Sequence, residues 1–145
     1  HDTIGSRLGK VVRVKEGLTY GINSGLGDVT VAGAPWKITV SVNPANIERT
    51  LSLINEVVAK YLEEGISERE LADEKGRVYG EFVVSLRNTL GLARALNQYQ
   101  SIGLGAAAMD TLESQYAAIS KGEADAAMRK YFRLDQAVTV IAGTF

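Results

Sequence analysis

The chain has 145 residues, 46% of them hydrophobic and 23% charged, which predicts one globular domain over residues 1–145. The formal net charge is -1, from 16 basic and 17 acidic residues without a long run of one sign, and this argues against nucleic acid as a partner. Cysteine is absent, which excludes disulfides and thiolate metal sites, and no apolar run approaches the roughly 20 residues that a membrane span needs.

A short amphipathic helix is expected near the start of the chain and is expected to end at Gly17. Glycine adopts the left-handed conformation of a helix C-terminus without a steric clash. A strand is predicted to begin at once, with Leu18, Tyr20 and Ile22 on one face. This turn brings a guanidinium, Arg13, and the Tyr20 phenol near the same corner. Both groups are donors suited to a carbonyl oxygen or a developing oxyanion.

The next segment, residues 23–34, is rich in glycine and is predicted to form a long hairpin connection with a short alternation over residues 29–31. Pro35 then opens a strand in which apolar and polar residues alternate. One face is predicted to be buried and the other to meet water or a cavity. The face predicted to be buried carries Trp36, Ile38, Val40 and Val42, and the other face carries Lys37, Thr39 and Ser41.

Two helices with clear boundary signals are expected after this strand. Asn43 followed by Pro44 predicts a helix start, because an asparagine caps the first turn and proline suits its first position. Gly65 is expected to end this helix. Ser67 and Glu70 have the spacing of a capping box and predict the start of the second helix.

The rest of the chain is predicted to be helical until a closing strand. Gly76 and Gly80 interrupt the second helix at a cost of about 1 kcal/mol each relative to alanine, which is tolerable if another helix packs closely there. Gly122 is expected to break a later helix. The remaining predicted elements are helices around residues 92–102, from residue 110 or 111 to Gly122, and over residues 124–132, and a strand containing Val138, Val140 and Ala142. This order favours an α+β fold of two layers, a sheet covered on one face by helices.

Five stretches in order resemble the C-terminal half of the insulinase/pitrilysin-type (M16) zinc metallopeptidases. RVKEGLTYG is similar to the family's arginine-to-tyrosine signature, with Arg13 and Tyr20 seven positions apart. The other stretches are ITVSVNPANIERTL, EEGISEREL, SLRNTLGLARAL and AVTVIAGTF. The resemblance implies mostly antiparallel strands. It also implies a half-domain truncated at its N-terminus, because the family's leading strand and helix are missing before Ser6.

The resemblance implies a substrate-binding role for Arg13 and Tyr20, which would hold the peptide backbone near the scissile bond and help to stabilise the tetrahedral intermediate. On residue types alone, an exposed helix-end arginine beside a half-buried strand tyrosine is the other interpretation. The family's zinc motif, H-x-x-E-H, is absent, and His1 is the only histidine. No catalytic residue and no metal ligand is therefore expected in this chain. Zinc and the general base are expected from a partner domain or subunit, and the chain alone is expected to be inactive.

Two functional hypotheses follow from the resemblance. The chain is either the substrate-binding, non-metal half of a zinc-dependent metalloendopeptidase or a non-catalytic peptide-binding or structural partner subunit of the same family. The expected partners are a peptide substrate and a zinc-bearing domain or subunit, and the polar face of the Trp36 strand would suit the wall of a substrate chamber. Self-association through an open sheet edge or a hydrophobic face is also predicted. The family suggests a soluble protein of the bacterial periplasm or cytoplasm, and the compartment stays open.

Overall fold

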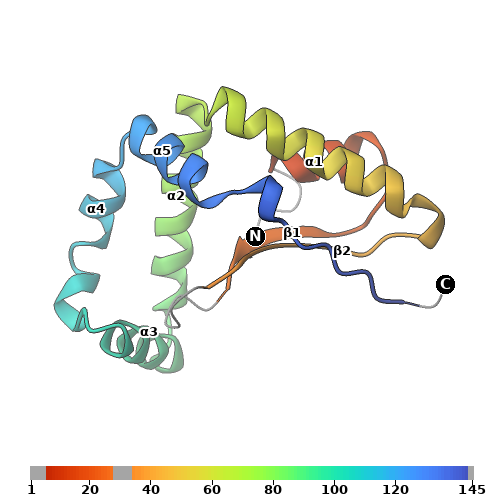
Figure 1. Ribbon diagram of the computed structural model, residues 1–145. Helices are drawn as coiled ribbons and strands as arrows, with labels where there is room; N and C mark the ends of the chain where they lie inside the picture. Colours follow the sequence, from red (N-terminus) through yellow and green to blue (C-terminus); the bar gives the residue numbers. More distant parts are fainter. Residues whose placement is uncertain (1–5, 28–33, 144–145) are drawn as a thin grey trace. The chain divides into compact units, whose positions relative to one another are not determined.

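The computed structural model describes residues 6–27 and 34–143 (Figure 1). The chain divides into two compact units. The first unit runs to Gly65 and resumes at Met128, and the second comprises Ile66–Ala127. The expectation of a single domain over residues 1–145 stays a prediction.

The first unit combines a two-stranded sheet with helices. Strands β1 and β2 pair in antiparallel fashion, with Ile22 opposite Val40 and Leu26 opposite Trp36. The elements of this unit are η1 (Gly9–Lys15), β1 (Ile22–Leu26), β2 (Trp36–Val40), η2 (Pro44–Asn46), α1 (Ile47–Glu64), the end of α5 (Lys121–Tyr131) and η4 (Leu134–Gln136).

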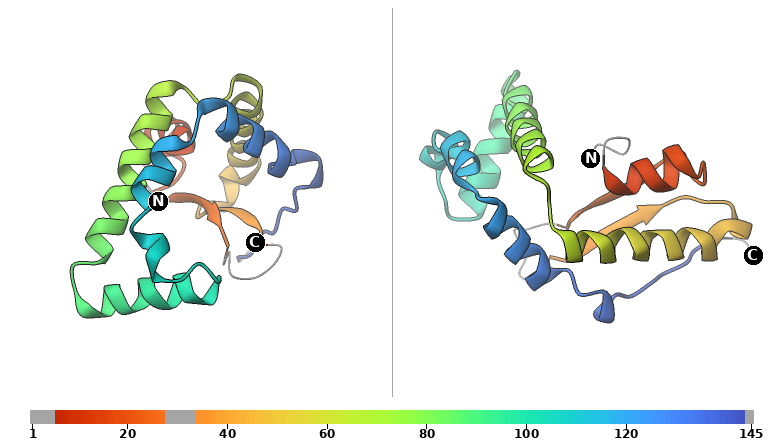
Figure 2. Two further views of the ribbon diagram at one scale, coloured as in Figure 1. Left: turned by 90° about the vertical axis from the view of Figure 1, so that its left-hand side faces the viewer. Right: turned by 90° about the horizontal axis from the view of Figure 1, so that it is seen from above.

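The core of the first unit lies between the sheet and the two helices η1 and α1, which lie on the same side of it in Figure 1 and side by side when seen from above in Figure 2. The π-helix η1 and the long α1 both contribute apolar side chains because their sequences repeat these at helical spacing. The buried cluster consists of Leu8, Val12, Ile22, Leu53, Ile54 and Val58. The predicted α+β class, with an antiparallel sheet covered on one face by helices, is confirmed.

The predicted boundary signals of this unit are present in the structure. Gly17 and Gly65 both have positive φ, +63° and +76°, where η1 and α1 end. The Asn43 side chain accepts a hydrogen bond from the Ala45 N–H at 3.0 Å and so caps the first turn before α1. On β2, Lys37 and Thr39 are exposed, as the alternation predicts.

Both bounds of the first predicted strand are wrong. Strand β1 begins at Ile22 instead of Leu18, because side-chain bonds of Thr19 shape the backbone over residues 18–21. It then continues through Leu26, so that residues 23–26 belong to the strand and not to the connection. The predicted alternation over residues 29–31 lies outside the described residues.

The predicted closing strand is also wrong. Residues 137–142 form neither helix nor strand, and Val138 and Val140 are 87% and 84% exposed. A β-strand exists only when its backbone N–H and C=O groups pair with a neighbouring strand. Within the described residues, the only strand pairing is that between β1 and β2.

The second unit is entirely helical and has a small core. It contains α2 (Glu68–Ser85), α3 (Thr89–Ser101), η3 (Ala106–Met109), α4 (Leu112–Ala118) and the start of α5. The longest helix, α2, contacts both α3 and α4 (Figure 2). Within residues 66–127, all of which the structure describes, the buried residues are Ala95 and Asp125. The helices of this unit therefore depend strongly on their own capping.

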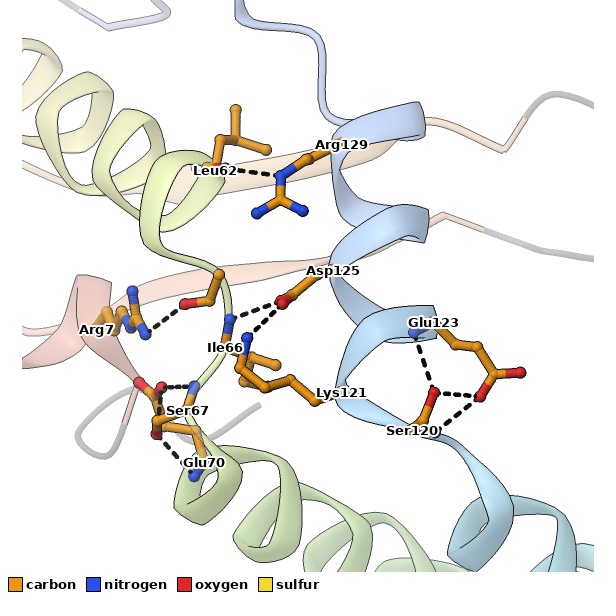
Figure 3. A network of polar contacts seen from close by, with 11 residues as sticks. Arg7, Leu62, Ile66, Ser67, Glu70, Ser120, Lys121, Glu123, Asp125 and Arg129 are labelled. Carbon is orange, nitrogen blue, oxygen red and sulfur yellow. Dashed lines mark hydrogen bonds and ion pairs between the residues drawn. The ribbon is translucent and has the colours of Figure 1, made fainter.

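The capping box predicted for α2 is confirmed, with Ser67 and Glu70 bonded reciprocally (Figure 3). Within the described residues, no helix packs closely on Gly76 or Gly80, because a Cβ at either position would meet nothing within 4 Å, so close packing does not offset the cost of these glycines. The expected break at Gly122 is wrong. α4 ends at Ala118, and Gly122 lies inside α5.

Arginine side chains hold the C-terminal end of α1 in the first unit (Figure 3). The Arg7 guanidinium donates to the Gly65 carbonyl oxygen at 2.9 Å and lies 4.7 Å from the centre of the Tyr61 ring. Arg129 donates from Nε to the Leu62 carbonyl oxygen at 3.2 Å. Both cations lie where the helix dipole is negative and where carbonyl groups lack partners within the helix.

At the start of the second unit, a buried carboxylate accepts a backbone N–H. Asp125 is 6% exposed, accepts the Ile66 N–H at 2.8 Å and pairs with Lys121 (Figure 3). A buried charge of this kind is tolerated because it is both paired and hydrogen-bonded.

Candidate functional site

The chain turns sharply at Gly17, between η1 and β1. The Gly17 N–H donates to the Arg13 carbonyl oxygen at 3.2 Å, and the Leu18 N–H donates to the Val12 carbonyl oxygen at 3.0 Å. These bonds satisfy carbonyl groups that would otherwise lack partners at the end of the helix. The backbone of Arg13 is therefore bonded to the turn that leads to Tyr20.

Thr19 and Tyr20 are neighbours with opposite exposure. Thr19 is 7% exposed, whereas Tyr20 is 96% exposed. The Thr19 hydroxyl lies 2.7 Å from the Ser41 carbonyl oxygen and 2.9 Å from the Gly21 carbonyl oxygen, and it accepts the Gly21 N–H at 3.1 Å. Simple strand alternation would place Tyr20 on the same face as the buried Ile22. The turn instead leaves the phenol in solvent.

Arg13 and Tyr20 line the same open depression of the first unit, about 650 Å³ in volume. One wall comes from the turn after η1 and the other from the segment between β2 and α1. The remaining lining residues are Gly17, Leu18, Thr19, Ser41, Val42, Asn43 and Asn46. The depression is therefore built from short-range structure at the two places where a helix and a strand adjoin.

Arg13 is the single charged residue among those that line the depression. Glu16, the nearest acidic residue in sequence, is directed to α1, where its carboxylate pairs with Arg49 at 3.4 Å. Across residues 6–27 and 34–143, Arg13 makes no ion pair and no side-chain hydrogen bond. Its guanidinium can therefore donate to a ligand without first losing a partner in this part of the chain.

The structure brings the two predicted substrate-binding residues, Arg13 and Tyr20, to one surface feature, and their role stays a prediction. Lys15 is exposed and does not line the depression. Sequence reasoning did not assign Thr19 or Asn46 to this site. The Asn-Pro helix start directly after a strand was the available signal for Asn46, because it marks where polar groups gather.

No group of three or more His, Cys, Asp or Glu side chains that could hold a metal ion occurs in the described part of the chain. His1 lies outside that part. The expectation that zinc comes from elsewhere stays a prediction.

Among the described residues, no helix combines the length and the apolar character needed to cross a membrane.

The chain has relatives among known protein families and solved structures. The family described as the peptidase M16 inactive domain matches residues 2–78, more than half of the chain. No curated protein matches the chain over its sequence. Several solved structures share its fold, among them two M16 proteins.

The first is a peptidase M16 inactive domain from Pseudomonas fluorescens, 28% identical, with a TM-score of 0.80 over 92% of this chain and 31% of that one. The second is the periplasmic protease PqqL from Escherichia coli, with 24% identity and a TM-score of 0.68, over 90% of this chain and 15% of that one. The second likeness shows the fold alone. The chain thus spans less than a third of the length of either relative. With the family match, the comparisons show that the chain belongs to the C-terminal, inactive domains of the M16 peptidases.

Proposed function

We propose that this chain is the substrate-binding, non-metal half of a zinc-dependent metalloendopeptidase. Arg13 and Tyr20 bind the substrate backbone there, while zinc and the general base belong to another domain or subunit. The observation that carries the proposal is that both residues line one open depression, with Tyr20 almost wholly exposed. A peptide could reach both groups without rearrangement of the turn.

The chemistry of the pair suits a peptide carbonyl group. The guanidinium offers several N–H donors in a fixed plane, and the phenol offers one O–H donor. Donors already in place when negative charge develops on a carbonyl oxygen lower the barrier, because no reorganisation is needed at that moment. The zinc of the partner would supply the activated water.

The surroundings of the depression favour a peptide as ligand. Ser41, Asn43 and Asn46 add neutral polar groups, and Leu18 and Val42 add apolar surface. Polar groups beside apolar surface can bind both the backbone amides and the varied side chains of a peptide. The exposed polar face of β2, with Lys37 and Thr39, would continue the wall of a chamber that encloses the substrate. The periplasmic location of PqqL makes the periplasm the first compartment to test for this chain.

The proposal is tested in the active peptidase formed by this chain together with its zinc-bearing domain or subunit. Arg13→Ala and Tyr20→Phe are each expected to lower kcat/KM about tenfold or more, which corresponds to roughly 1.4 kcal/mol of transition-state stabilisation per factor of ten. The measurement is the steady-state hydrolysis of a synthetic unstructured peptide, with products separated by chromatography.

Matched controls are Lys15→Ala and Tyr131→Phe, which alter an exposed cation and an exposed phenol that do not line the depression. Both controls are expected to keep wild-type turnover. If Arg13→Ala and Tyr20→Phe also keep it, the pair has no part in catalysis, and the non-catalytic structural or peptide-binding subunit becomes the better interpretation.

A further inference from the structure

We propose that Thr19 is a positioning residue for Tyr20, whose hydroxyl fixes the backbone from which the phenol reaches the substrate. The proposal rests on the function proposed above and adds a residue to it that does not itself donate to the peptide. It follows from how Tyr20 is held in the first unit.

The Tyr20 ring has almost no protein surface around it. At 96% exposed, it makes too little packing contact to fix its direction. An exposed side chain of this kind samples several rotamers, and the φ and ψ of its backbone decide which of them are allowed. Catalytic donors lose much of their effect when they are misplaced by about 1 Å, a loss that can reach roughly a hundredfold. The order that Tyr20 needs must therefore come from its main chain.

The hydroxyl of Thr19 supplies that constraint on both sides of Tyr20. It accepts the Gly21 N–H at 3.1 Å, which closes a small turn around Tyr20. It also lies 2.7 Å from the carbonyl oxygen of Ser41, to which it can donate. Ser41 follows β2 directly and lines the same depression. One buried hydroxyl thus links the two walls of the site.

The residue types at this turn agree with such a role. Gly21 follows Tyr20 and is the residue type with the least backbone restriction of its own. Thr19 is β-branched and 7% exposed, so its side-chain torsion is held by both its chemistry and its surroundings. The rigid Thr19 precedes Tyr20 and the permissive Gly21 follows it. The Thr19 hydroxyl accepts the Gly21 N–H and so ties these two residues together.

The test uses a double-mutant cycle in the active peptidase formed with the zinc-bearing domain or subunit. Thr19→Val keeps the shape of the side chain and removes the hydroxyl, whereas Thr19→Ser keeps the hydroxyl. Thr19→Val is expected to lower kcat about tenfold through misplacement of Tyr20, and Thr19→Ser is expected to retain most of the activity. In a Tyr20→Phe background, Thr19→Val is expected to change kcat less than about twofold, because the phenol is already gone.

Three results would overturn this inference, and they differ from one another. If Tyr20→Phe lowers kcat but Thr19→Val does not, Thr19 does not position the phenol, and the proposed function stands. If Thr19→Val lowers kcat equally in both backgrounds, its effect is general stability, which a parallel fall in melting temperature would show. If Tyr20→Phe has no effect on kcat, the proposed function fails and this inference fails with it.

Discussion

Thr50 on α1 is 1% exposed, and its hydroxyl is the one buried side-chain oxygen or nitrogen among the described residues without a hydrogen-bond partner. Burying a hydroxyl without a bond costs free energy, because the bond to water is lost and nothing replaces it. Thr50→Val has nearly the same shape and is therefore expected to raise the free energy of unfolding by about 1 kcal/mol. Urea unfolding of the two proteins measures the difference.

Thr39→Val is the control for this prediction. Thr39 lies on the exposed face of β2, where its hydroxyl keeps its water in the folded protein. If only Thr50→Val stabilises the protein, the Thr50 hydroxyl is buried without a hydrogen-bond partner, as predicted. A loss of stability in Thr50→Val would mean that its hydroxyl contributes to the fold after all.

At the residue scale, the sequence predicted which side chains gather at the site better than how they are oriented. Arg13 and Tyr20 were placed at a common corner, and they line a common depression. The exposure of Tyr20 could not follow from strand alternation, since the segment before Ile22 is not a strand. Its conformation depends on Thr19 and Ser41, which are 22 positions apart, and that contact has no signal in the local sequence.

Among the helices, two glycines of the second unit are expected to respond to alanine in opposite ways. Gly76 in α2 has open space around its Cβ position, whereas a Cβ on Gly91 in α3 would overlap the Ser85 carbonyl oxygen. Gly76→Ala is expected to stabilise the unit by about 1 kcal/mol through helix propensity. Gly91→Ala is expected to destabilise it by roughly 2 kcal/mol, because backbone atoms must shift to relieve the overlap.

The helical circular-dichroism signal during thermal unfolding measures both changes. Each variant serves as the control for the other, since both add one methyl group to a helix of the same unit. Equal shifts of the melting temperature in the same direction would contradict the geometry of the turn between α2 and α3.

The start of α5 is expected to lose stability in acid. The pKa of Glu123 is held below its usual value near 4.5, chiefly by the Ser120 N–H and then by the Ser120 hydroxyl. A carboxyl with a lowered pKa in the folded state contributes stability above its unfolded pKa, and this is lost as pH falls through the folded pKa. The contribution of the cap should therefore be full at neutral pH, begin to fall near pH 4.5, and be lost only below the lower pKa of the folded state.

Unfolding curves of wild type and Glu123→Gln across the acid range test this. The difference between them is expected to shrink as pH falls, because protonation removes from wild type the charge that the variant already lacks. Glu63→Gln, which changes an exposed carboxylate in the last turn of α1, is the control. A pH-independent difference would show that the Glu123 charge has no part in the cap.

Boundaries set by local chemistry were the predictable part of the elements. The Asn43-Pro44 start, the Ser67–Glu70 box and the Gly65 end each depend on residues within one turn of each other. The start of α5 has the same kind of signal in Ser120 and Glu123, and this signal places the helix boundary before Gly122, where a break was predicted. The closing strand failed for a different reason, since a strand requires a partner that periodicity cannot identify.

For the whole molecule, self-association at high concentration stays a prediction. Within the described residues, β1 and β2 pair only with each other, so each strand has one outer edge without a strand partner. Edges of this kind tend to pair with other chains, and a charged side chain on the edge opposes it. Light scattering is expected to show a mass that rises with concentration, and Leu26→Lys on β1 is expected to reduce the rise.

Ala59→Lys places the same charge on an exposed position of α1 and is the control. It is expected to leave the association unchanged. A chain that remains monomeric over the whole concentration range would contradict the prediction.

The stacking of Trp36 on Phe132, with ring centroids 4.2 Å apart, joins two stretches of the first unit that lie on either side of the second unit in sequence. Trp36 is also the only tryptophan of the chain. Its fluorescence emission is therefore a built-in reporter of whether the C-terminal stretch has returned to β2. Proteolytic cleavage anywhere in Ile66–Ala127 would leave that stretch on a separate fragment, and a red shift of the emission would mark its departure.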